Sequence, residues 1–305
     1  MEDRLETMQI PTISFASRDA TRLANLEAAL ADTGFMLLSD TGIEVAQISA
    51  VFEASRSFFQ CSDEFKQRFR YHGATDNFGY QSVGMESLDP DRPPDLKEAL
   101  TVRNPSARRD ADWPSAGLRD LLLDFYQRCL VVAHKLQGDT ATLLDVPRDY
   151  FHSRITGENV TLRLLHYPPL AARESGQLGA GAHTDYGLLT LLFQDQVGGL
   201  EVLGQQSDTW IPVAPRAGEI VVNTGDLMER WTNGRFRSTC HRVQPQTGTG
   251  DRYSLALFLD PDDTVEVSCL PSCVSARNPA RYPPTTAGEH ILAKLRASHR
   301  VNNLH

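Results

Sequence analysis

A histidine and an aspartate separated by one residue, His183 and Asp185, precede the apolar run from Leu188 to Phe193, which is typical of a buried strand. In an extended chain, residues i and i+2 point to the same side, so the imidazole and the carboxylate can be aimed at one point. They would supply two ligands of a 2-His-1-carboxylate facial triad, which holds a ferrous ion and leaves its other coordination positions open. A polar turn before a strand is the simpler alternative, because a His-x-Asp pair alone is not specific.

The third ligand should come from another strand, and His241 in the alternating segment 237–243 is the best candidate. A lone histidine in a strand is more often a core or surface residue, but the upstream His-x-Asp pair favours iron ligation. Zinc is the alternative metal, although zinc sites usually hold more Cys or His around a tetrahedral ion. Among the other histidines, only His166 lies on a strand that could line the same cavity.

A possible carboxylate-binding pair follows in the segment Arg252-Tyr253-Ser254. In a strand, Arg252 and Ser254 share one face, and a guanidinium fork beside a hydroxyl can hold a carboxylate. Tyr167 could add a phenol to the same anion. An arginine salt bridge at a strand rim is the alternative, and it would be the default if the metal triad were absent.

The N-terminal half must supply helices and a few strands around these residues. Apolar residues recur at helical spacing in several segments, whereas short apolar or alternating runs predict strands. The segment 71–94 is rich in Gly and Pro and predicts a long loop of the kind that forms lids or binding loops. The expected helices are 19–32, 45–59 and about 118–144, and the expected strands are 10–15, 35–38 and 96–102.

The C-terminal half changes character at about residue 156. Many short strands at regular spacing, punctuated by glycines, predict a sandwich or barrel, here a jelly roll, followed by a final helix over 287–298. The expected fold is therefore α+β: a helical or mixed region, 1–155, packed on a jelly-roll core with a C-terminal helix, 156–305, as one continuous structural unit.

Bulk composition excludes several classes of function. The 305 residues carry a net charge of −9 and a pI near 5.5, which argues against a nucleic-acid surface and against a polybasic membrane anchor. No apolar stretch approaches the ~20 residues of a membrane span, and the acidic N-terminus lacks a secretory signal. Five cysteines without a zinc-like C-x-x-C pair predict reduced thiols in a cytoplasmic protein.

Together these segments resemble the iron(II)/2-oxoglutarate-dependent oxygenases of the isopenicillin-N-synthase-like family, and within it the thymine-hydroxylase-like and ethylene-forming-enzyme-like branch. The resemblance covers nearly the whole chain and is most specific in the C-terminal half. The segments that carry it there are 162–168, 183–187, 198–200, 222–227, 232–234, 241–243 and 252–254.

Residue by residue, the resemblance implies a double-stranded β-helix (jelly roll) with iron(II) on His183, Asp185 and His241. It implies that Arg252 and Ser254 bind the distal carboxylate of 2-oxoglutarate, with Tyr167 nearby, and that O2 is the second co-substrate.

The substrate-binding residues are less sharply indicated. Arg163 and Glu86 resemble positions that contact substrate in these relatives, whereas a structural salt bridge and an exposed loop carboxylate are the simpler interpretations. Three aromatic residues could form pocket walls or belong to the core: Tyr186, Trp231 and Phe258.

The expected activity is oxidation of a C–H bond in a small molecule, most simply hydroxylation, with 2-oxoglutarate converted to succinate and CO2. An oxidase or cyclase of the isopenicillin-N-synthase type, or ethylene formation, could use the same iron site. A jelly-roll protein that only binds or senses its ligand is the alternative of another class. Such a protein has no need of both the metal triad and the carboxylate-binding pair Arg252 and Ser254. The expected partner is a small molecule, not nucleic acid or membrane, and the sequence leaves the oligomeric state open.

Overall fold

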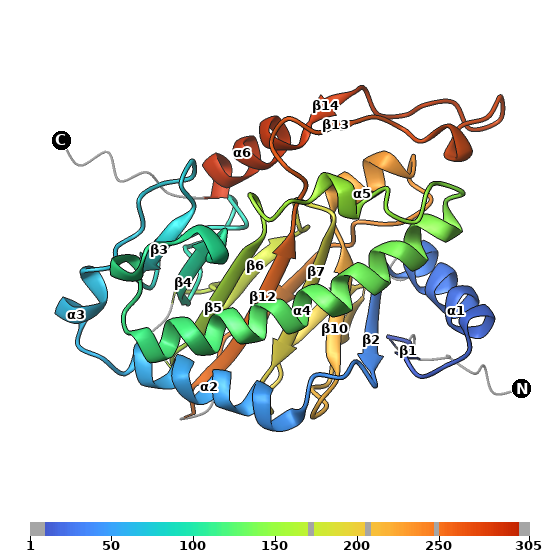
Figure 1. The fold of residues 1–305 in the computed structure, drawn as a ribbon. Coiled ribbons are helices and arrows are strands. Elements are labelled where there is room, and N and C mark those ends of the chain that lie inside the picture. Colours follow the sequence, from blue (N-terminus) through green and yellow to red (C-terminus); the bar gives the residue numbers. More distant parts are fainter. Residues whose placement is uncertain (1–9, 170–173, 205–208, 247–249, 299–305) are drawn as a thin grey trace, which may run out of the picture.

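The computed structural model describes residues 10–169, 174–204, 209–246 and 250–298 (Figure 1). An eight-stranded major sheet runs through the molecule in the order β1-β2-β10-β7-β12-β5-β4-β3. β1 and β2 are parallel, and every other neighbouring pair in this sheet is antiparallel. Its strands are β1 (Thr12–Ser14), β2 (Phe35–Ser39), β3 (Phe78–Gln81), β4 (Glu98–Arg103), β5 (Thr161–Tyr167), β7 (Leu189–Gln194), β10 (Ile220–Thr224) and β12 (Arg252–Leu259).

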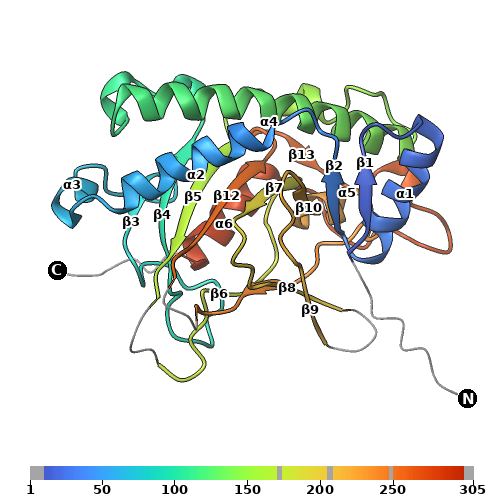
Figure 2. The ribbon, with the colours of Figure 1, turned by 90° about the horizontal axis from the view of Figure 1, so that it is seen from below.

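A four-stranded minor sheet, in the order β6-β11-β8-β9, lies on the opposite side of the major sheet from the long helices (Figure 2). Apolar side chains from both sheets, among them Leu37, Leu165, Leu200 and Val243, form one buried cluster between them. The two facing sheets confirm the expected jelly roll. The minor strands are β6 (Ala180–His183), β8 (Leu200–Leu203), β9 (Trp210–Pro212) and β11 (His241–Val243).

Helices α2 and α4 cover the outer face of the major sheet, where α2 contacts β5 and β12 and α4 contacts β12 (Figures 1 and 2). The buried stripe of α4 includes Leu122, Phe125, Cys129 and Leu136, which explains the helical spacing seen in the sequence. The α-helices are α1 (Asp19–Asp32), α2 (Val45–Phe59), α3 (Asp63–Gln67), α4 (Ala116–Leu143), α5 (Asp226–Trp231) and α6 (Ala287–Ser298). The remaining elements are the short pair β13 (Glu266–Val267) and β14 (Thr285–Thr286) and the 3-10 turns Pro105–Ala107, Asp110–Asp112, His152–Arg154 and Pro271–Cys273.

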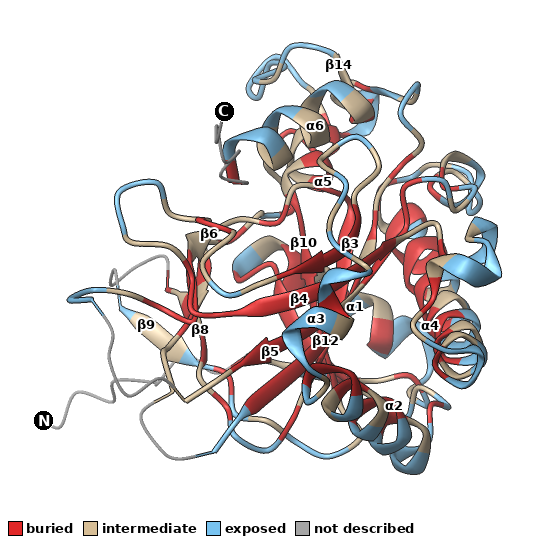
Figure 3. Ribbon diagram, turned by 90° about the vertical axis from the view of Figure 1, so that its left-hand side faces the viewer, coloured by how far each residue is buried: buried red, intermediate tan, exposed pale blue. Residues whose placement is uncertain are grey.

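Burial follows this layered arrangement (Figure 3). Apart from the edge strand β1, the strands of the major sheet are largely buried, because helices cover one face and the minor sheet covers much of the other. None of the helices in the described ranges has both the length and the apolar character that crossing a bilayer requires.

The expected loop at 71–94 contains a strand that the sequence did not predict. β3 pairs with β4, and Gly79 at φ +117° brings its backbone against the carbonyl oxygen of Arg70. A Cβ at Gly79 would lie 2.5 Å from that oxygen, so the glycine that suggested a loop is needed inside the strand. The short elements α3, α5 and β6 were also missed, because they hold too few residues to show a period.

Candidate active site

His183 and His241 are brought together by strand pairing. His183 is the last residue of β6, His241 is the first of β11, and the two are register partners in the minor sheet, with ring centroids 4.3 Å apart. Asp185 lies beyond the end of β6, so only His183 of the expected His-x-Asp pair is on a strand. Its Oδ1 is nevertheless 3.9 Å from the Nε2 atom of His183 and 3.7 Å from that of His241. The three ligand atoms lie within 4.8 Å of one another, as a shared metal ion requires.

The backbone fixes which nitrogen each histidine offers. The Nδ1 atom of His183 lies 2.7 Å from the carbonyl oxygen of Gly181, and that of His241 lies 3.1 Å from the carbonyl oxygen of Thr239. A proton on each Nδ1 donates to these oxygens and leaves the Nε2 lone pairs directed toward Asp185. Burial, reinforced by the neighbouring His241, lowers the pKa of His183 to about 3, so this imidazole is neutral and suited to ligation.

The Asp185 carboxylate is held by two donors that the sequence analysis did not single out as site residues. Thr190 on β7 and Asn223 on β10 each donate a hydrogen bond of 2.6 Å to its Oδ2 atom. Oδ1 is thereby left for the metal, and the carboxylate cannot rotate freely. Asn223 lies in one of the segments that carried the family resemblance, whereas Thr190 is hidden within an apolar run.

Arg252 and Ser254 face a small cavity between the sheets. This inner cavity, of about 70 Å³, is also lined by His183, Asp185 and His241. The Nε atom of Arg252 donates to the carbonyl oxygen of Gly198 at 2.5 Å, and its Nη2 atom donates to the Gln194 side chain at 3.2 Å.

Two donors in the inner cavity have no protein partner. Within the described part of the chain, the Arg252 Nη1 and the Ser254 hydroxyl are fully buried and make no hydrogen bond. Leaving such groups unsatisfied costs ~1–3 kcal/mol each, and a carboxylate would satisfy both. The donors therefore fit the distal carboxylate of 2-oxoglutarate, just as the three ligand atoms fit a ferrous ion.

Tyr167 and Lys97 complete the polar wall of the inner cavity. Tyr167 is the register partner of Arg252, whose guanidinium lies 4.6 Å from the centre of the tyrosine ring. Lys97 was not recognised as a site residue from the sequence. Its buried ammonium pairs with Asp95 and lies 3.2 Å from Glu86, and these two carboxylates hold its pKa above the usual range despite burial. No spacing rule reveals it, because its partners come from the loop before β4.

A second cavity, of about 80 Å³, shares His183 and Asp185 with the inner cavity. We call it the middle cavity. It is lined by His183 and Asp185 and by four of the predicted substrate residues: Glu86, Arg163, Tyr186 and Phe258. α6 closes it with Ile291, Leu295 and Ser298.

Two of those substrate residues form a buried ion pair. An Arg163 Nη2 atom lies 2.9 Å from both carboxylate oxygens of Glu86. Glu86 is only 4% exposed, so the interpretation as an exposed loop carboxylate is corrected. Burial raises the pKa of Tyr186 to about 12, so its phenol stays protonated and can donate.

Two other candidates lie away from the metal centre. Trp231 on α5 is buried in the core against Phe151, with ring centroids 5.4 Å apart, and is not among the described residues that line the inner or middle cavity. His166 points to the opposite face of β5. It is hydrogen-bonded to Glu98 and Asp251 and stacks on the Tyr253 ring. It is therefore no substitute for His241.

Comparison with protein families agrees with this geometry. Residues 158–261 match the family model of the 2OG-Fe(II) oxygenase superfamily. Residues 10–120 match the model described as the non-haem dioxygenase in morphine synthesis N-terminal. The two matches cover most of both halves of the chain.

Individual relatives and solved structures extend the similarity over nearly the whole length. A 2-oxoglutarate-Fe(II) type oxidoreductase of Emericella nidulans is 32% identical over 82% of this chain and 76% of its own length. A proline hydroxylase of Petromyces alliaceus is 33% identical over 87% of this chain and 89% of its own. The full-length T7H of Neurospora crassa, crystallised with alpha-KG (2-oxoglutarate) and thymine, has a TM-score of 0.85 and 28% identity, covering 96% of this chain and 98% of that one. A rice dioxygenase for auxin oxidation has a TM-score of 0.78 and 28% identity, covering 95% and 96%.

Proposed function

Since the chain belongs to the 2OG-Fe(II) oxygenase superfamily, we propose that it hydroxylates a C–H bond of a small polar molecule at a centre formed by His183, Asp185 and His241. The chain is an Fe(II)- and 2-oxoglutarate-dependent dioxygenase, and this class couples the two co-substrates, 2-oxoglutarate and O2. The observation that carries the residue assignment is the inner cavity, where the three possible ligands face two buried donors that lack a protein partner.

In this proposal, the two Nε2 atoms and the Asp185 Oδ1 would hold the iron. Hydrogen bonds to Gly181 O and Thr239 O orient the imidazoles, and those from Thr190 and Asn223 orient the carboxylate. Three of these partners, Gly181, Thr190 and Asn223, lie on strands, and Thr239 lies just before β11, so the ligands are arranged before the metal arrives.

Arg252 and Ser254 bind the distal carboxylate of 2-oxoglutarate in the same proposal. The Arg252 Nη1 and the Ser254 hydroxyl donate to it, while the remaining guanidinium nitrogens stay on Gly198 and Gln194. Tyr167 supports the guanidinium through its ring. When bound, iron and 2-oxoglutarate supply the oxidation, in which 2-oxoglutarate, O2 and the substrate C–H group give succinate, CO2 and an alcohol.

The substrate is proposed to bind in the middle cavity. Tyr186 and Phe258 supply its aromatic surface, and Arg163 supplies a guanidinium edge whose charge Glu86 offsets. Thymine in the Neurospora structure and proline in the name of the Petromyces relative are both small polar ring compounds, which supports a ligand of this size. Leu88 and α6 shield the reacting carbon from solvent.

The assay that tests the assignment is succinate formation from 2-oxoglutarate by the Fe(II)-loaded protein in air, with and without a panel of small metabolites. We expect a basal rate that rises with a suitable substrate, and an anaerobic charge-transfer band that shifts when that substrate binds. Absence of succinate in protein that demonstrably retains iron would contradict the proposal. Substrate oxidation without consumption of 2-oxoglutarate would instead indicate the oxidase alternative, and ethylene release would indicate the ethylene-forming one.

We also propose a cytoplasmic location. All five cysteines are free thiols in the structure, including the fully buried Cys129, which fits a reducing compartment. Recovery of the native protein with an intermolecular or intramolecular disulfide would argue against it.

A further inference from the structure

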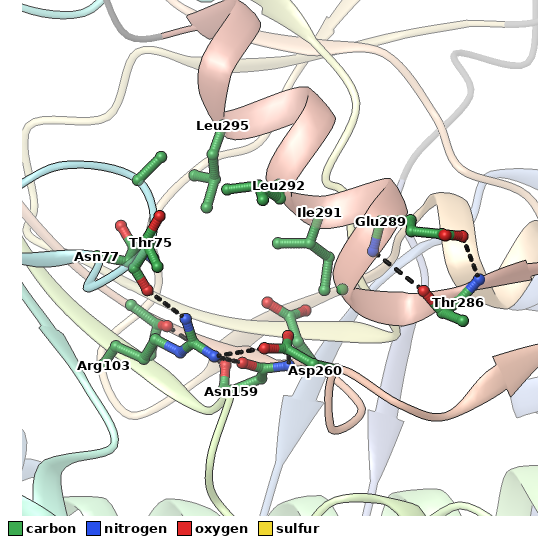
Figure 4. Close-up of a pocket in the computed structure, with 14 residues that line it drawn as sticks. Thr75, Asn77, Arg103, Asn159, Asp260, Thr286, Glu289, Ile291, Leu292 and Leu295 are labelled. Carbon is green, nitrogen blue, oxygen red and sulfur yellow. Dashed lines mark hydrogen bonds and ion pairs between the residues drawn. The ribbon is translucent and has the colours of Figure 1, made fainter.

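A third cavity, of about 290 Å³, adjoins the middle cavity (Figure 4). This outer cavity lies between α6 and the ends of β4, β5 and β12, and the apolar side chains of Ile291, Leu292 and Leu295 on α6 face Thr75 and Asn77 across it. The residues that line both the middle and the outer cavity are Asn77, Thr161, Asp260, Ile291 and Leu295.

The volumes indicate that one ligand uses both spaces. At about 80 Å³, the middle cavity is well below the ~300–1,000 Å³ typical of small-molecule sites. With the outer cavity added, the space reaches the lower end of that range. A substrate can thus place its reacting carbon beside His183 and Asp185 and extend its remainder along α6.

Asp260 is the charged residue at the junction of the two cavities. It directly follows β12, and its carboxylate lies over Gly187, where an added Cβ would be 1.5 Å from Oδ1. The carboxylate accepts a hydrogen bond from the Leu188 N–H, and no described side chain donates to it. Burial, with a smaller contribution from Asp185, raises the pKa of Asp260 to about 7, and the charge of Arg103 opposes this shift without a hydrogen bond to the carboxylate.

The other charged groups of the outer cavity already have partners. Arg103 donates to the carbonyl oxygens of Glu158 and Thr75 at 3.0 and 2.8 Å and also to the Asn159 side chain. Asp263 accepts from Asn159 at 2.7 Å and lies 3.4 Å from Arg103.

The acid at the far wall is also engaged, because a Glu289 oxygen accepts from the Thr286 N–H at 3.2 Å. In the middle cavity, Arg163 and Glu86 neutralise each other. Asp260 is thus left as the acceptor at the junction with unused capacity.

We propose that Asp260 determines substrate specificity by binding a protonated amine or another cationic N–H donor, and that the substrate spans the middle and outer cavities. This inference rests on the proposed function, since the middle cavity must be the substrate site. An amine would pair with Asp260 while its carbon skeleton contacts Ile291 and Leu295. A carboxylate on the substrate would be repelled by Asp260 at the junction.

The test uses anaerobic calorimetry on the Fe(II)- and 2-oxoglutarate-loaded protein. The probes are primary amines, each matched to the alcohol of the same skeleton, such as benzylamine with benzyl alcohol and 1,5-diaminopentane with 5-aminopentanol and pentane-1,5-diol. We expect at least one amine to bind about tenfold or more tightly than its alcohol, because a hydrogen bond to a charged group is worth more than a neutral one. Equal affinities throughout the panel would overturn the inference.

Two variants sharpen this test. Asp260→Asn should reduce the amine preference to less than about threefold, whereas Asp120→Asn, the same change at an exposed carboxylate on α4 that lines none of the three cavities, should leave both the preference and basal succinate formation as in wild type. Leu292→Trp, at a residue that lines the outer but not the middle cavity, should weaken the longer amines more than the shorter ones. An amine preference that survives Asp260→Asn would assign the cation to another group.

The outcome for the proposed function is read separately. Wild-type protein that forms succinate but shows no amine preference would contradict the role of Asp260 alone. Protein that retains iron and forms no succinate would contradict the proposed function, whatever the calorimetry shows.

Discussion

Neighbouring strands in fixed register wall the inner cavity, whereas a loop and the last helix close the outer one. His183 and His241 are paired residues of the minor sheet, and Arg252 lies on the same strand as Ser254. The outer cavity is instead lined by residues from separate segments of the chain, near positions 75, 103, 260 and 290. A strand framework can hold ligand atoms in place for unchanging chemistry, and a wall of loops and a helix can vary with the substrate.

Loss of a metal ligand is the strongest test of the inner region. His241→Ala should abolish iron retention and reduce succinate formation by at least ~1,000-fold, because two remaining ligands cannot hold the metal against solvent. Iron content after gel filtration and the rate of succinate release measure the two effects. His134→Ala, at an exposed histidine on α4, is the control and should change neither. An active His241→Ala protein would mean that the third ligand is misassigned.

Removal of the guanidinium should separate co-substrate binding from metal binding. Arg252→Ala should raise the 2-oxoglutarate concentration for half-maximal succinate formation by ~100-fold, because the distal carboxylate loses a buried, charge-assisted partner. Iron content should stay close to that of wild type. Arg242→Ala is the matched control, because Arg242 pairs with Glu201 at 2.7 Å outside the inner cavity. An unchanged 2-oxoglutarate requirement in Arg252→Ala would place the carboxylate elsewhere.

The contrast between the regions also explains what could be predicted from the sequence. The alternation of side chains along a strand predicts that Arg252 and Ser254 face the same side. This part of the inner cavity was therefore predictable from the sequence. The sequence likewise predicted the longer helices α1, α2, α4 and α6, with α6 expected at 287–298. The jelly roll followed from many short strands at regular spacing, and the family resemblance implied the same fold.

The residues that were missed depend on contacts between distant segments. Asn223 and Thr190 meet Asp185 only because β10, β7 and the end of β6 converge. Trp231 was a candidate for a pocket wall, but α5 turns it into the core, and no local pattern distinguishes these outcomes. Glu86 pairs with a residue 77 positions away, so its burial could not be read from its own loop.

That buried ion pair offers a stability test of the substrate side. Glu86 is only 4% exposed, and Glu86→Gln leaves Arg163 without its carboxylate partner. Lys97 retains its ion pair with Asp95. Breaking a buried pair by removing one partner costs ~3–5 kcal/mol. Because Asp95 still neutralises Lys97, only Arg163 loses its partner, and the free energy of unfolding should fall by ~2 kcal/mol. Urea unfolding measures it.

A surface pair provides the comparison for that measurement. Glu53→Gln removes an exposed partner of Arg56 on α2 and should change the free energy of unfolding by less than ~0.5 kcal/mol. Equal effects of the two substitutions would show that the Arg163 pair contributes no more than a surface contact does.

The smallest expected effect concerns how α6 is anchored over the outer cavity. Asp226, at the start of α5, accepts a hydrogen bond from Ser238 at 2.7 Å and pairs with Lys294 on α6 at 2.7 Å and with His290 at 3.5 Å. These partners hold the pKa of Asp226 well below its usual range, despite burial that opposes them. A carboxyl with a depressed folded pKa stabilises the protein above its unfolded pKa of ~3.9, and the contribution is lost as pH falls below that value.

The difference in unfolding free energy between wild type and Asp226→Asn should therefore be ~1 kcal/mol at pH 7, since Lys294 is partly exposed, and should shrink steadily as the pH falls below about 4. Urea unfolding of both proteins between pH 7 and pH 3 measures it, and Asp120→Asn on the exposed face of α4 is the control. Because the anchor holds α6 and not the strands, hydrogen exchange should quicken in 287–298 before it changes in β6 or β11. Simultaneous loss of protection in both would mean that the helix and the metal-binding strands open as one unit, and the contrast between the two cavity walls would not hold.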